Sequence, residues 1–151
     1  MIIAVDFDGT VVRQDNRDYK DVETPLELVE YAEYGLKALK RAGHTLVLWS
    51  ARASPALVND WRFHPVWVRY EKEPPWWAAS REVNQARYNQ MVEFVRERLP
   101  GIFDAIDAGT AGKMPADLYI DDKARAFAPG QGAGWLRLVH EFGELPGDDD
   151  G

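Results

Sequence analysis

The stretch Ile2-Ile3-Ala4-Val5-Asp6-Phe7-Asp8-Gly9-Thr10 decides the fold of this chain. Its first residues are uniformly apolar, which is typical of a strand buried on both faces of a parallel sheet. The run ends in two carboxylates, and ligands of open α/β sheets bind where the strands end. Asp6 and Asp8 are therefore candidates for an attacking group or metal ligand and for a proton carrier. Taken alone, the stretch fits a strand followed by an ordinary Asp-Gly turn equally well.

Two later stretches also pass from apolar to polar residues. The run 45–49 is followed by Ser50, and the run 117–120 is followed by Asp121 and Asp122. Adjacent carboxylates repel each other, and a nearby cation makes that arrangement easier to sustain. The alternatives are a turn or helix-cap role for the serine and a plain Asp-Asp turn.

The segments between these runs carry helical and turn signals. Thr24-Pro25-Leu26-Glu27 matches a capping box that would open a helix, although the safer part of that helix is about 31–42. The polar segment 14–21 suits a short hairpin or flap over the strand end. Charges alternate with apolar residues over 81–99, which indicates an amphipathic helix. We expect further strands at 102–106 and at 135–142. The glycine-rich segment 130–134 does not match a dinucleotide-binding fingerprint.

The alternation of strands and helices predicts an α/β fold, a Rossmann-like three-layer αβα sandwich with a central parallel sheet. Residues 1–145 would form a single domain, followed by an acidic tail at 146–151. In such a sheet the carboxyl ends of all strands meet at one edge. The candidate site residues expected at that edge are Asp6, Asp8, Ser50, Lys113, Asp121 and Asp122. Their oxygen ligands favour a hard cation such as Mg²⁺.

Composition narrows the function classes. The chain has 151 residues, of which 46% are hydrophobic and 28% charged, as in an ordinary globular protein. A net charge of -7 argues against a broad nucleic-acid-binding surface. The chain has no cysteine and no apolar run long enough to span a membrane. The apolar start is too short for a signal peptide, so we expect a cytoplasmic protein with no membrane partner.

The segment 53–80 is rich in tryptophan and carries four prolines, in an irregular pattern. Its aromatic side chains could form a lid or a platform on which a substrate ring stacks. They could equally pack a local core or a contact between two copies of the chain, which is the commoner use of large aromatic residues. The sequence leaves the oligomeric state open.

In the order of these residues, the chain resembles the haloacid dehalogenase-like (HAD) hydrolase superfamily. Asp6-Phe7-Asp8-Gly9-Thr10 resembles the first motif of that family, DxDGT. Ser50 after an apolar run resembles the second motif, Lys113 the third, and Asp121-Asp122 the fourth. The resemblance covers the chain from its first residues to about Lys123. The stretch 113–122 is also similar to small, uncharacterised phage and bacterial members.

The resemblance implies a Mg²⁺-dependent phosphatase that works through an aspartyl-phosphate. Asp6 would attack phosphorus, and Asp8 would protonate the leaving oxygen and then activate water. Mg²⁺ would be held by the Asp6 carboxylate, the backbone carbonyl of Asp8 and Asp121, with Asp122 binding it directly or through water. The remaining implied roles are phosphate binding by Ser50 and Lys113. Arg52 is a candidate substrate contact, with a surface ion pair as the alternative.

Two departures bear on the substrate. Residues 11–45 leave no room for a sizeable cap domain, and 53–80 looks short for one, so we expect a capless or minimally lidded member. The leading expectation is a hydrolase of small phosphorylated metabolites or nucleotides. The alternatives are a nucleic-acid end phosphatase and a catalytically inactive module that binds phosphate or Mg²⁺. The scaffold alone does not choose the leaving group.

Overall fold

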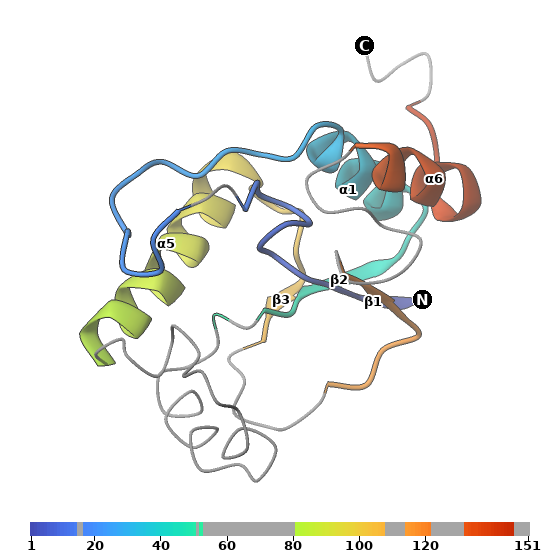
Figure 1. Cartoon of the computed structure of the whole chain (residues 1–151). Helices are drawn as coiled ribbons and strands as arrows, with labels where there is room; N and C mark the ends of the chain where they lie inside the picture. Colours follow the sequence, from blue (N-terminus) through green and yellow to red (C-terminus); the bar gives the residue numbers. More distant parts are fainter. Residues whose placement is uncertain (15–16, 51, 53–80, 108–113, 122–131, 147–151) are drawn as a thin grey trace, which may run out of the picture.

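The computed structural model describes residues 1–14, 17–50, 52, 81–107, 114–121 and 132–146. Its strands are β1 (Ile2–Val5), β2 (Thr45–Leu48), β3 (Ala105–Ile106) and β4 (Leu118–Ile120), and its helices are α1 (Ala32–Arg41), α5 (Arg81–Arg98) and α6 (Ala133–Phe142) (Figure 1). The strands form one parallel sheet in the order β3-β2-β1-β4. This central parallel sheet flanked by helices confirms the predicted α/β class and is consistent with a Rossmann-like three-layer sandwich.

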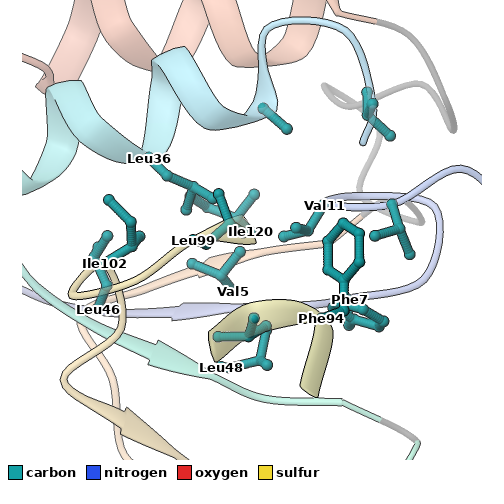
Figure 2. Packing of buried hydrophobic residues seen from close by; sticks show 14 of the residues in the cluster. Val5, Phe7, Val11, Leu36, Leu46, Leu48, Phe94, Leu99, Ile102 and Ile120 are labelled. Carbon is teal, nitrogen blue, oxygen red and sulfur yellow. The ribbon is translucent and has the colours of Figure 1, made fainter. Parts of the chain in front are cut away.

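Strand β1 lies inside the sheet because its sequence is apolar on both faces. Ile3, Ala4 and Val5 are fully buried. Ile3 is in register with Leu46 of β2, and Val5 with Leu48, so the larger side chains of the two strands share one face. That face carries the main core, and Figure 2 shows side chains from the strands and the helices meeting there.

Helices α1 and α6 pack against each other above the strands (Figure 1). Gly35 of α1 allows this close approach, since a Cβ atom there would lie 2.5 Å from Cε3 of Trp135 in α6. The Trp135 ring is fully buried, and its Nε1 donates a hydrogen bond to the carbonyl of Thr10 at 2.8 Å. The last helix therefore holds the loop that follows β1.

Helix α5 covers another part of the core. Its Phe94 contacts Phe7 edge to face, with ring centres 6.1 Å apart (Figure 2). The helix spans the predicted segment and is followed by Gly101, which has the positive φ of 73° that favours glycine at a helix end. Phe7 thus points into the core, while the two acids on either side of it do not.

The capping box predicted at 24–27 is wrong, because the helix begins only at Ala32. Asp21 captures Thr24 instead: its carboxylate accepts hydrogen bonds from the backbone N–H groups of Glu23 and Thr24 and from the Thr24 hydroxyl. Such local bonds compete with helix formation. The alternative, that the early part belongs to a flap, is the better interpretation, since Val12 pairs with Leu28 and closes the excursion between them.

The strand predicted at 135–142 is also wrong, since Ala133–Phe142 is helix α6. Trp135 and Val139 are buried, whereas Leu136 is 43% exposed, which is a helical rather than an alternating pattern. Gly132 precedes the helix at a place where a Cβ atom would lie 2.8 Å from the carbonyl oxygen of Glu30. This close approach accounts for glycine at that position. In the part of the chain that the structure describes, no helix is long and apolar enough to cross a membrane.

Candidate functional site

Asp6 and Asp121 emerge from neighbouring strands at the same level of the carboxyl edge. Val5 is in register with Ile120, and the Asp6 N–H donates to the Ile120 carbonyl at 2.9 Å. Adjacent strands are roughly 4.8 Å apart, so the residues that follow this register pair are close neighbours. Both acids are partly exposed. The structure thus brings together two predicted site residues that lie far apart in the sequence.

Ser50 reaches the same edge from the other neighbour of β1. The Trp49 N–H donates to the Val5 carbonyl at 2.8 Å, which extends the pairing of β2 with β1 to the residue before the serine. The Ser50 hydroxyl oxygen accepts a hydrogen bond from the Arg52 N–H at 3.0 Å, as in a turn. A hydroxyl that accepts one bond still has its own hydrogen to donate. The turn role and the phosphate-binding role are therefore compatible.

A sharp reversal of the chain separates Asp8 from Asp6. The Phe7 carbonyl accepts hydrogen bonds from the N–H groups of Thr10, Val11 and Val12, at 3.2, 2.9 and 3.2 Å. Gly9 takes a positive φ of 82°, a conformation that favours glycine. The reversal turns the Asp8 carboxylate toward α5 and Arg52.

Arg52 holds Asp8 in a two-pronged ion pair. Its Nε donates to one carboxylate oxygen and its Nη2 to the other, both at 2.8 Å. Its Nη1 donates to the carbonyl of Arg87 at 3.1 Å and to Oε1 of Gln90 at 3.0 Å, both in α5. The Arg52 side chain is 3% exposed and that of Asp8 21%. Arg52 therefore forms the ion pair that was the predicted alternative to a substrate contact, but the pair is partly buried instead of lying on the surface, and its partner is the candidate acid Asp8.

Two aromatic rings lie next to the strand that carries Asp6. Trp49 follows β2 and Tyr119 belongs to β4, and these two strands lie on either side of β1. The centres of the two rings are 5.5 Å apart. Tyr119 is in register with Ala4, whose small, fully buried side chain leaves space for rings from both sides. The rings thus give the sheet an apolar cover on the face opposite the main core.

A hollow of about 450 Å³ opens beside Asp8, and sequence reasoning missed it. Arg13, Arg17, Tyr19 and Arg87 contribute to its wall, together with Asp8. The flap and helix α5 bring these residues together. No local pattern in the sequence marks them, since each reads as an ordinary polar or charged surface residue.

Tyr19 and Arg87 form the most ordered part of that wall. The guanidinium carbon of Arg87 lies 3.9 Å from the centre of the Tyr19 ring, and its Nη1 donates to the Tyr19 carbonyl at 3.0 Å. The Tyr19 hydroxyl donates to Oδ1 of the buried Asn84 at 2.9 Å. Burial raises the pKa of Tyr19. Burial, and then the like charge of Arg52, lowers the pKa of Arg87.

The described acids fit the chemistry of Mg²⁺ in part. Mg²⁺ commonly takes one or two protein carboxylates and completes its shell with water and substrate oxygens, and Asp6 and Asp121 could supply such a pair. Among the described residues, however, no three acidic or histidine side chains are grouped closely enough to form a cage by themselves. Asp8 turns its carboxylate to Arg52, so the carbonyl oxygen is the part left for the metal role that the resemblance implies.

Several predicted elements lie outside the described residues. These are Lys113, Asp122, the tryptophan-rich segment 53–80 and the tail from 147 onward. Their expected roles stay predictions, including the choice between a lid and a local core for 53–80.

Comparisons with family models and with curated proteins find no match for this chain. Among solved structures, the chain is similar to one described as a conserved protein from Bacteroides thetaiotaomicron, at 25% sequence identity. The match covers 93% of this chain and 91% of that one, with a TM-score of 0.49. A TM-score at this level supports no inference about function.

Proposed function

We propose that this protein is a Mg²⁺-dependent phosphomonoester hydrolase that works through an aspartyl-phosphate on small phosphorylated substrates. The observation that carries the proposal is the register of β1 with β2 and β4. This register gathers Asp6, Ser50 and Asp121 at one edge of the sheet, in the order that the resemblance to HAD hydrolases requires. Phosphoryl transfer chiefly needs positioned groups and neutralised charge.

The chemistry assigns distinct roles to the two acids after β1. A carboxylate oxygen of Asp6 would form the bond to phosphorus as the bond from phosphorus to the leaving oxygen breaks. Asp8 would give its proton to that oxygen. In the second step Asp8 would take a proton from water, whose oxygen attacks phosphorus and releases Asp6. Asp6 and Asp121 would hold Mg²⁺, which would neutralise the negative charge on the phosphoryl oxygens.

The ion pair with Arg52 constrains this cycle. The two-pronged bond is made by the carboxylate form of Asp8, which is the form that accepts a proton from water in the second step. For the first step Asp8 must carry a proton, which removes its negative charge and weakens both bonds from Arg52. Arg52 therefore acts as a positioning residue in this scheme.

The test begins with hydrolysis of an aryl phosphate in the presence of Mg²⁺. We expect Asp6→Asn to abolish turnover, while Asp107→Asn, a matched change after β3 at the same sheet edge, should keep it. Beryllofluoride with Mg²⁺ should form a stable adduct with the wild-type protein and none with Asp6→Asn. Turnover that survives in Asp6→Asn would refute the aspartyl-phosphate. An adduct without turnover on any phosphate ester would favour a binding module over an enzyme.

A further inference from the structure

We propose that the hollow beside Asp8 binds a second anionic group on the leaving side of the substrate. The preferred substrates would then be small phosphomonoesters whose leaving group carries a phosphate or a carboxylate. This inference rests on the proposed function, which determines which part of the substrate enters the hollow. The residues of the hollow indicate that this part carries a negative charge.

The position of Asp8 fixes which part of the substrate enters the hollow. In the proposed reaction Asp8 protonates the leaving oxygen, so the leaving group must lie next to its carboxylate. Asp8 is itself part of the wall of the hollow. The volume of about 450 Å³ is within the range of sites for small ligands. The hollow is therefore large enough to hold a leaving group of several carbon atoms.

The charges of the wall favour an anion there. Three arginines, Arg13, Arg17 and Arg87, face two acids, Asp8 and Asp18. The charge of Asp8 is already matched by Arg52, which bonds both of its oxygens. Arg13 is likewise paired with Glu27 at 3.6 Å. Arg17 and Arg87 then face Asp18 alone, which leaves the wall with a small positive excess in a chain whose net charge is -7. A local excess of positive charge in an acidic protein is suited to an anionic ligand.

Two arginines of the hollow, Arg17 and Arg87, are held in place by contacts with the protein. Arg17 donates from Nη1 to the Thr24 carbonyl at 2.5 Å and from Nη2 to the Pro25 carbonyl at 2.9 Å. Arg87 is stacked on Tyr19 and makes no ion pair with a carboxylate of the described residues within 4.0 Å. A guanidinium that is ordered in advance loses little freedom when it binds an anion.

Three phosphate esters that share a three-carbon chain test the proposal: propyl phosphate, the phosphate ester of 3-hydroxypropionate and propane-1,3-diol bisphosphate. We expect the wild-type kcat/KM for each of the last two to exceed that for propyl phosphate by about tenfold or more. The carboxylate and phosphate compounds then show which anion the hollow prefers. Arg87→Gln should lower this preference about tenfold, and Arg13→Gln should lower it less, since Arg13 is more exposed.

Arg96→Gln is the matched control, because Arg96 is an exposed arginine of the same helix and is not part of the hollow. It should leave the preference unchanged. Calorimetric titration of Asp6→Asn with the bisphosphate provides a readout without turnover, and adding Arg87→Gln should weaken that binding. Equal hydrolysis of all three compounds, unaltered by Arg87→Gln or Arg13→Gln, would overturn the inference and leave the proposed function standing. Binding that depends on Arg87 without hydrolysis of any compound would support the anion site and refute the proposed function.

Discussion

Replacing Arg52 by methionine should destabilise the protein by about 3 kcal/mol. Removing one partner of a buried ion pair typically costs about 3–5 kcal/mol, because the other charge stays buried without a partner. Asp8 would be left in that state, but its side chain is 21% exposed, which places the expected cost near the lower end. Methionine keeps an apolar stem near the Phe7 ring, over which the Arg52 guanidinium now lies at 5.3 Å. The loss therefore reports on charge and hydrogen bonding more than on packing.

Urea unfolding followed by tryptophan fluorescence measures this loss, provided that the dependence of the free energy on urea keeps the same slope. Lys37→Met is the control, since it breaks only the exposed pair of Lys37 with Glu33 and should cost less than about 1 kcal/mol. The double variant Asp8→Asn/Arg52→Met should lose less than the sum of the two single losses. A loss for Arg52→Met no larger than that for Lys37→Met, or strictly additive losses, would refute a buried, coupled pair.

Three further predictions follow from the packing and the pKa shifts. Gly35→Ala should lower the free energy of unfolding by about 1–2 kcal/mol in urea, because overpacking against Trp135 exceeds the gain in helix propensity, whereas Glu33→Ala in the same helix should have little effect. Hydrogen bonds from Thr24 and Glu23 lower the pKa of Asp21 to about 2, so in an NMR titration Thr24→Val should raise it; the stabilisation is complete above about pH 4 and is lost as the pH falls toward 2. Tyr19 should ionise above its usual pKa of 10.0 because it is buried, and ultraviolet titration of the wild type against Tyr19→Phe would show no such group if this is incorrect.

The strands and their edge could be predicted because local pattern determines them. Apolar runs as short as Ile2–Val5 and Leu118–Ile120 have few uses other than as buried strands. Once such strands are parallel, the residues after them must meet at one edge. The neighbouring positions of Asp6 and Asp121 therefore follow from the sequence without knowledge of any side-chain contact.

The two errors in secondary structure have different physical origins. The hydroxyl of Thr24 could cap a helix or bond to a nearby carboxylate. In the structure the hydroxyl and the N–H of Thr24 both donate to the carboxylate of Asp21. That competition between short-range bonds cannot be decided from the pattern alone. At 135–142 the signal was present: Trp135, Leu138, Val139 and Phe142 have helical spacing. The dense apolar run obscured this spacing.

The hollow and the role of Arg52 could not be predicted, because both depend on contacts between distant segments. Arg52 meets Asp8 across a separation of 44 positions, and Arg87 meets Tyr19 across 68. An arginine has the same appearance in the sequence whether its guanidinium is in solvent or under a flap. Which of these applies is decided by tertiary packing, after the local elements have formed.

The contrast between Asp6 and Asp8 shows how one short loop can give two acids different chemistry. Asp6 follows β1 directly and lies beside Asp121, and these two acids would hold Mg²⁺ in the proposed reaction. Asp8, beyond the reversal at Gly9, receives its positive charge from the protein itself through Arg52. A nucleophile gains from a cation that also binds the phosphoryl group, whereas a proton carrier must exchange its proton with the leaving group and with water. Carboxylates placed in such different surroundings are suited to different roles in one reaction. Phe7, between the two acids, is fully buried and packs against Phe94, so the chain on either side of it is fixed to the core.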